Sequence, residues 1–206
     1  MNINIAALIA VGIILLVGFP VHEFTHALVA DRLGDHTARY MGRLSLDPRV
    51  HFDPLGGGIL ILSALVGGIF VGWAKPTPVN PVNLQGGRRG EAWVAAGGPF
   101  SNLVMAALVA VAVRAIITLG LPVPNLLFEI LSYFVLINVF LFLFNLLPIP
   151  PLDGYRVLTG VVDARTAYSL RQLEQYGFIL IVLLFLFAGP IIGPIGVRIY
   201  SLLIGA

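Results

Sequence analysis

The chain has 206 residues, of which 58% are hydrophobic and only 11% are charged. A soluble globular protein carries about 25% charged residues, so the composition excludes that class and predicts one membrane-embedded domain over residues 1–206. The net charge of +2 comes mainly from loop arginines and indicates membrane topology rather than a nucleic-acid partner. Without a cysteine, the chain has neither a disulfide nor a thiolate ligand for a metal.

The first predicted element is one helix over residues 1–33, almost entirely apolar from Ile3 to Pro20. At about 1.5 Å per residue it is roughly 45 Å long, more than the ~30 Å hydrocarbon core of a bilayer. Pro20 removes a backbone donor and is expected to kink the helix. Asp31 and Arg32 mark its charged end, so residues 22–26 are expected inside the bilayer, about two to three turns from that end.

An HExxH motif lies in this helix, where residues 22–26 are His-Glu-Phe-Thr-His. Side chains four residues apart share one helix face, so His22 and His26 can bind one zinc ion with Glu23 beside them. Polar groups at membrane depth are costly and therefore indicate a functional site. The alternative is a histidine pair whose hydrogen bonds are satisfied by neighbouring helices.

Residues 34–90 are predicted to form an interfacial connection to the second helix. Residues 34–55 contain short alternating pieces that could pair as strands. Residues 56–73 are apolar but contain glycines at 56–58 and 67–68, which suit a re-entrant hairpin that enters the membrane and returns. The alternative is a segment that crosses the membrane.

Basic residues decide between these two arrangements. If residues 56–73 cross, ten loop cations divide four to six between the two sides; if the segment returns, all ten share one side. The positive-inside rule favours the second arrangement, which places the site nearer the cytoplasmic face of a multi-pass cell-membrane protein. The ten residues are Arg32, Arg39, Arg43, Arg49, Lys75, Arg88, Arg89, Arg156, Arg165 and Arg171.

Residues 91–160 are predicted to hold the second and third helices, joined by a turn at 120–124. The third helix breaks at Pro148-Ile-Pro150-Pro151, and Asp153-Gly154 follows. Residues 161–206 are expected to form a kinked C-terminal helix, because Gly-Pro pairs occur at 189–190 and 193–194. The predicted class is therefore an all-α membrane protein with about four transmembrane helices and a re-entrant or short β segment.

A catalytic zinc ion needs three protein ligands, and the HExxH motif supplies two. Asp153 is the favoured third ligand, because a proline-broken helix end allows an acidic side chain to turn inward at the depth of the histidines. His51 is the alternative ligand. Asp153-Gly154 could also be an ordinary turn after a helix end.

Three motifs together resemble the site-2 protease family of intramembrane zinc metalloproteases. They are the HExxH motif, Asn145-x-x-Pro148 followed by Asp153-Gly154, and the Gly-Pro-x-x-Asn pattern at 98–102. Residues 42–48 and 73–81 are similar to the compact bacterial and archaeal branch, and the resemblance covers roughly residues 15–160. The family's PDZ and CBS-type regulatory domains are not expected here, nor is a helix before the HExxH helix.

The resemblance implies regulated intramembrane proteolysis, with one zinc ion per chain and transmembrane proteins as substrates. We expect Glu23 to act as the general base towards a zinc-bound water. Asn102 and Asn145 could hold the substrate backbone or the oxyanion; their alternative role is hydrogen bonding between helices. The sequence predicts no particular oligomeric state and no particular substrate.

Two rival functions place similar residues in a membrane. A metal transporter would show ligands along several helices and often repeated halves, whereas these ligands converge and the chain has no repeat. A catalytically inactive scaffold would not need a glutamate at position 23. Both rivals are therefore less favoured than a protease.

Overall fold

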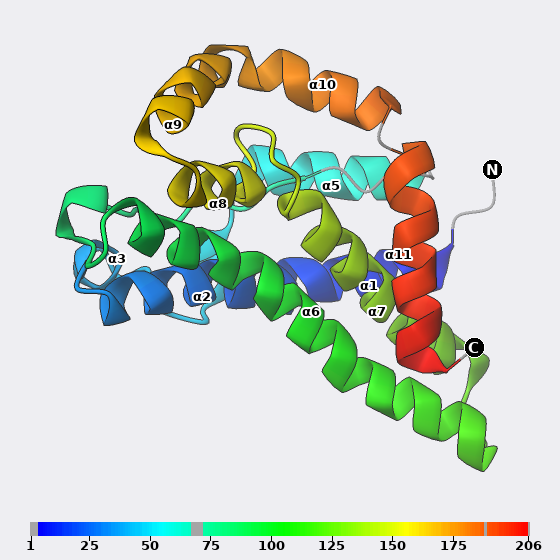
Figure 1. Ribbon diagram of the computed structural model, residues 1–206. Helices are drawn as coiled ribbons and strands as arrows, with labels where there is room; N and C mark the ends of the chain where they lie inside the picture. The colour runs from blue at the N-terminus through cyan, green and yellow to red at the C-terminus, as the bar shows by residue number, and fades with distance from the viewer. Residues whose placement is uncertain (1–3, 67–71, 188, 206) are drawn as a thin grey trace.

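The computed structural model describes residues 4–66, 72–187 and 189–205, and over these residues helices are the regular secondary structure (Figure 1). This confirms the predicted all-α class. The α-helices are α1 (Ile5–Ile13), α2 (Phe19–Arg32), α3 (Thr37–Tyr40), α4 (Pro48–His51), α5 (Pro54–Val66), α6 (Arg88–Leu119), α7 (Asn125–Asn145), α8 (Asp153–Val161), α9 (Ala164–Arg171), α10 (Gly177–Phe187) and α11 (Gly189–Ile204). A π-helical segment, η1 (Ile14–Gly18), and two 3₁₀ segments, η2 (Pro81–Asn83) and η3 (Gln172–Tyr176), complete them.

Among the described residues, three helices are long and apolar enough to cross a membrane. They are Ile5–Arg32, which joins α1, η1 and α2, then α6 and α7, with 28, 32 and 21 residues. About 20 apolar residues span a bilayer core, so the protein is membrane-embedded. The predicted fourth span is not confirmed, because α10 has 11 residues, α11 has 16, and the two run in different directions (Figure 1).

A π-helical segment, η1, directly precedes the turn that contains Pro20, where the sequence predicts a kink. The N–H of Phe19 bonds the carbonyl of Ile14, five residues back. A proline within a helix has no N–H to donate, and its ring crowds the preceding turn. The wider turn of η1 accommodates Pro20 without ending the helix, as π segments do elsewhere.

The prediction of short paired strands in residues 34–55 is wrong. The structure has two four-residue helices there, α3 and α4. The side chain of Asp47 accepts the N–H of Arg49 at 2.9 Å and caps α4, whose first residue is Pro48. An aspartate before a proline favours a helix start, and this local signal outweighs the alternating pattern of the segment.

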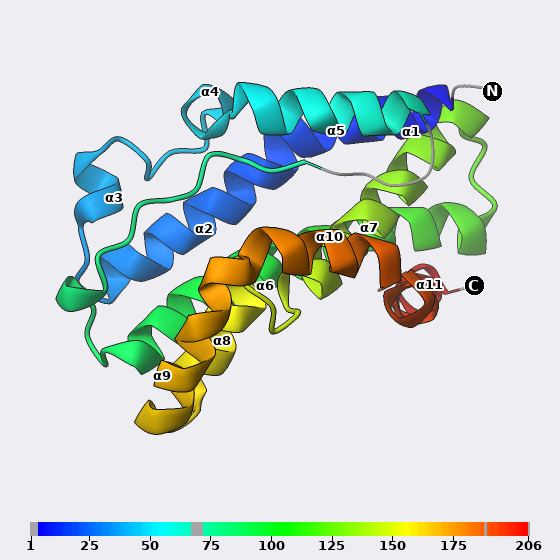
Figure 2. The same cartoon turned by 90° about the horizontal axis from the view of Figure 1, so that it is seen from above.

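The region predicted to be re-entrant, 56–73, begins within α5, and its last two residues lie beside that helix. Its central residues 67–71, with Gly67 and Gly68, lie outside the described residues. A Cβ at Gly56 would lie 2.1 Å from the carbonyl oxygen of Trp73, and one at Gly72 would lie 2.4 Å from Cβ of Leu60. Residues 72 and 73 therefore lie against α5, and the chain then runs past α2 towards α3 (Figure 2).

Helix α6 organises the molecule because it packs against α2, α7 and α8. One buried apolar cluster joins α1, η1, α5 and α7, and a second joins α6, α7 and α11. Small residues allow the close approach of α6 to α2, since a Cβ at Gly98 would lie only 2.3 Å from the side chain of His26. Close backbone contact at small residues is typical of helices packed in a membrane.

Candidate metal centre

Helix α2 presents His22 and His26 on the same face, one turn apart. Both rings are buried, their centroids are 4.7 Å apart, and their Nε2 atoms are 3.0 Å apart. This follows from the helical repeat, which brings residues four apart together.

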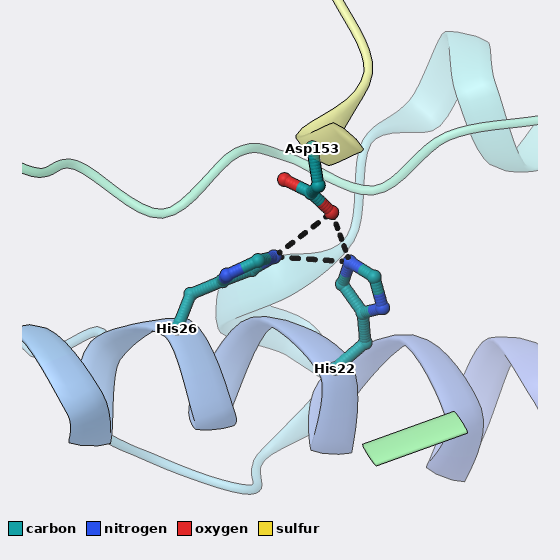
Figure 3. A group of neighbouring side chains, drawn as sticks. All are labelled: His22, His26 and Asp153. Atoms are coloured by element: carbon teal, nitrogen blue, oxygen red, sulfur yellow. Dashed lines mark hydrogen bonds and ion pairs between the residues drawn. The ribbon is translucent and has the colours of Figure 1, made fainter. Parts of the chain in front are cut away.

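Asp153 reaches the same point from the other side of the site (Figure 3). Its Oδ2 lies 3.2 Å from Nε2 of His22 and 3.3 Å from Nε2 of His26. Asp153 is the first residue of α8, after the proline-rich segment that ends α7. A Cβ at Gly154 would lie 2.1 Å from the carbonyl oxygen of Leu146, so only glycine fits the close turn that carries the aspartate.

These three residues fit a zinc ion. Donor atoms about 2.0–2.2 Å from a tetrahedral zinc ion are about 3.3–3.6 Å apart, and the observed separations are 3.0, 3.2 and 3.3 Å. Two imidazole nitrogens with one carboxylate oxygen are also a donor set of catalytic zinc sites. Within the described parts of the chain, no other group of three or more potential ligands converges in this way.

The second nitrogen of each ring is held by a hydrogen-bond acceptor. Nδ1 of His22 lies 2.6 Å from Oδ1 of Asn102, and Nδ1 of His26 lies 2.7 Å from the carbonyl oxygen of Val94. An acceptor at Nδ1 requires the proton there, which leaves the Nε2 lone pair for a metal. The amide nitrogen of Asn102 donates in turn to Oδ1 of Asn138 at 2.9 Å, and all of Asn138 is buried.

Gly98 on α6 faces the converging Nε2 atoms of both histidines. A Cβ there would lie 2.3 Å from Nε2 of His26 and 2.5 Å from Nε2 of His22. Any side chain at this position would therefore occupy the space between the rings. Gly98 belongs to the Gly-Pro-x-x-Asn pattern of the sequence, but the pattern alone indicates no role for it. No motif points to the carbonyl of Val94 or to Asn138.

Glu23 is buried beside the three converging residues but is not one of them. Its Oε2 accepts the backbone N–H of Thr77 at 2.8 Å, and its carbonyl oxygen accepts the Thr77 hydroxyl at 3.0 Å. Thr77 comes from the return path of the chain, 54 positions away. No motif in the sequence indicates this contact.

Two further residues that the sequence analysis singled out, Asn145 and His51, bond backbone carbonyls close to them in the chain. The amide nitrogen of Asn145 donates to the carbonyl of Leu141 on its own helix at 2.9 Å. His51, the alternative third ligand, is buried, and its Nε2 donates to the carbonyl of Ser45 at 2.7 Å. It is not a member of the converging group.

Comparisons with known proteins identify the family of this chain. The model for "Peptidase family M50" matches residues 120–189. The protein named "Putative zinc metalloprotease YwhC" from Bacillus subtilis is 40% identical over 177 residues, which are 84% of this chain and 78% of that protein. Proteins named "Putative zinc metalloprotease Rip2" from Mycobacterium tuberculosis and Mycolicibacterium smegmatis are each 33% identical, over 83% and 82% of this chain and 64% and 63% of their own lengths.

No solved structure matches the chain significantly. With an HExxH helix, a converging aspartate and relatives of this similarity, the chain belongs to peptidase family M50, the site-2 protease family.

Proposed function

We propose that this protein is an intramembrane zinc metalloprotease that hydrolyses peptide bonds within or near transmembrane segments of membrane proteins. One observation carries the proposal. Three donor atoms, Nε2 of His22, Nε2 of His26 and Oδ2 of Asp153, converge within 3.3 Å of one another, and the two histidines belong to a helix of membrane-spanning length. A buried glutamate follows the first of these ligands directly.

The three converging residues would hold one zinc ion per chain. A zinc ion bound there would polarise the scissile carbonyl and make a bound water more acidic. The hydrogen bonds at Nδ1 of both histidines support this assignment, because they present Nε2 of each ring as a ligand. The names of the relatives, which describe zinc metalloproteases, are consistent with it.

Glu23 would accept the proton of the attacking water and pass it to the leaving amine. Such general acid–base catalysis is worth about 10²- to 10⁴-fold in rate. Asn102 would keep the His22 ring in place, since its amide oxygen already bonds that ring. Asn145 remains our candidate for contact with the substrate backbone or the oxyanion, for which its amide would have to leave the carbonyl of Leu141.

The arrangement of the helices supports a site near the cytoplasmic face. The end of α2, the start of α6 and the helices α3 and α9 all lie at one end of the molecule (Figures 1 and 2), and each carries an arginine. The turn at 120–124 lies at the other end and has no charged residue. This distribution favours a cytoplasmic basic end, and α5 with its return would then form the re-entrant hairpin.

The test is cleavage of a transmembrane peptide substrate by purified protein in detergent or liposomes. Glu23→Gln should reduce turnover by about 10²- to 10⁴-fold while the zinc content stays near one per chain, because the base is lost and the ligands remain. Removal of zinc by a chelator should abolish turnover, and added zinc should restore it.

Glu129→Gln is the matched control. Glu129 is an exposed glutamate of α7, and its substitution makes the same chemical change away from the site. It should cleave at the wild-type rate. Undiminished turnover by the Glu23→Gln protein, with zinc bound, would show that hydrolysis does not use this glutamate and would contradict the mechanism.

A further inference from the structure

We propose that Thr77 is a positioning residue for peptide hydrolysis, because its backbone N–H holds the carboxylate of Glu23 in place. This inference rests on the proposed function, in which Glu23 is the base. Thr77 contacts Glu23 at two points: its N–H donates to Oε2 at 2.8 Å and its hydroxyl donates to the backbone carbonyl at 3.0 Å. The two contacts fix both ends of the glutamate against the same residue.

The neighbours of Thr77 make its N–H the only backbone donor of residues 76–78. Pro76 and Pro78 flank it, and proline has no backbone N–H. A segment of alternating prolines is also held in an extended conformation, which fixes the direction of the remaining N–H. The sequence Pro-Thr-Pro therefore presents one oriented donor, and Oε2 of Glu23 accepts it.

The segment 75–77 is itself anchored by groups outside the site. The buried guanidinium of Arg43 donates to the carbonyl of Lys75 at 2.5 Å, to that of Pro76 at 2.9 Å and to that of Val50. The N–H of Lys75 donates to the carbonyl of His51 at 2.8 Å. The donor at Thr77 is thus supported by a network that does not include the ligands.

This arrangement affects how Glu23 can act. A glutamate side chain has several rotatable bonds, and a base works efficiently only when held within reach of the proton it removes. In the described part of the chain, the N–H of Thr77 is the only hydrogen-bond donor to the Glu23 carboxylate. With Oε2 held, the other oxygen keeps a defined position, and Thr77 acts through Glu23 rather than on the substrate.

The sharpest test compares two proteins that have the same side chain at position 77 and differ in whether this N–H is present. One protein carries alanine at position 77, Thr77→Ala. The other carries lactic acid there, which has the side chain of alanine but an ester oxygen in place of the backbone N–H. The two proteins have the same side chain and differ in the donor. Thr77→Pro is a second variant, which removes the same N–H but keeps an amide carbonyl at Pro76 for Arg43. Zinc content, kcat and KM are measured on a transmembrane peptide substrate.

We expect kcat of the lactic acid protein to be roughly 10- to 100-fold below that of the Thr77→Ala protein. This decrease is smaller than the full effect of losing the base, because Glu23 is still present but is held less well. KM should change by less than about twofold, because substrate binding does not use this bond, and zinc content should be equal. A purely structural role would instead change zinc content or KM together with kcat. If Thr77→Pro loses zinc, the lactic acid protein alone decides.

Equal kcat for the alanine and lactic acid proteins would overturn the inference. A higher kcat after removal of the N–H would also overturn the inference, because it would show that the bond from Thr77 hinders Glu23. Wild-type and Glu23→Gln proteins are assayed alongside: an inactive wild type or an active Glu23→Gln protein would refute the proposed function, whereas a normal pair with equal kcat at position 77 would refute only the role of Thr77.

Discussion

At the scale of single residues, the site depends on a position that has no side chain. The Nε2 atoms of His22 and His26 face Gly98 of α6, where a Cβ would approach to 2.5 and 2.3 Å. The shorter of these distances is close to the length of a zinc–ligand bond, about 2.0–2.1 Å for nitrogen. A methyl group at position 98 would therefore compete with the ion for the same space.

Gly98→Ala should accordingly reduce zinc affinity by at least the roughly 10- to 100-fold seen when supporting groups of a metal site are lost. The alanine is otherwise favourable in a helix, so the protein should still fold. Zinc affinity is measured by competition with a chelating dye, and folding by the circular dichroism of the helices.

Gly97→Ala provides the matched control on the same turn of α6. Its Cβ would meet the side chains of Val29 and Thr25 at 3.2 and 3.3 Å, which can shift slightly, and no ligand atom. It should bind zinc like the wild type. Equal zinc affinity for the two alanine variants would contradict the role of Gly98.

At the scale of elements, one buried carboxylate ties the loops around the site together. Asp35 accepts the N–H and the hydroxyl of Thr37, the N–H of Asn80 at 2.7 Å and the amide of Asn83 at 3.2 Å. Burial by itself raises the pKa of Asp35, but these hydrogen bonds outweigh it and hold the pKa below its usual value. The connection after α2 is thereby joined to the segment that leads from Thr77 to α6.

The sign of this pKa shift predicts how stability depends on pH. A carboxyl with a lowered pKa in the folded state contributes stability above its unfolded pKa of about 4, and the contribution is lost as the pH falls through the folded value. Asp35→Asn should therefore lower the free energy of unfolding by about 1–2 kcal/mol at pH 7. The difference from wild type should shrink near pH 3.

Thermal unfolding in detergent at both pH values measures this difference. Asp47→Asn is the control, because asparagine also caps a helix well and the ion pair of Asp47 with Arg49, whose side chain is 88% exposed, contributes little. A pH-independent effect of Asp35→Asn would indicate that the ionised carboxylate is not what stabilises the loops.

At the scale of the whole molecule, charge is distributed unevenly along the helices. The basic loops gather at the end where α2 finishes and α6 begins, and the 120–124 turn joins α6 to α7 at the opposite end (Figures 1 and 2). Three helices of membrane-spanning length, counted over the described residues, lie between these ends, and we expect the basic end to face the cytoplasm.

Single cysteines test this orientation directly, because the chain has none of its own. Leu121→Cys lies in the turn and Tyr168→Cys lies on α9, and both native side chains are exposed. A membrane-impermeant thiol reagent should label position 121 in spheroplasts and label position 168 only after lysis. The reverse pattern would place the basic end outside. Labelling of both positions in spheroplasts would contradict the prediction that they lie on opposite sides of the membrane.

Much of this protein is predictable from the sequence because the signals are local. The helical class follows from long apolar segments, and the pairing of His22 with His26 follows from the helical repeat alone. The strands expected in residues 34–55 fail for an equally local reason, since the Asp47-Pro48 cap signals a helix start that the alternating pattern obscured.

The sequence by itself determined the chemistry of this protein: an HExxH motif in an apolar helix, and an aspartate after a proline-broken helix end. Only the tertiary structure decided that Asp153 lies 3.2 Å from His22, that Asn102 holds that ring and that Thr77 holds Glu23. The reason is physical. Residue types and short spacings are local properties of a chain, whereas contacts between residues 54 to 131 positions apart depend on how complete helices and their connections pack.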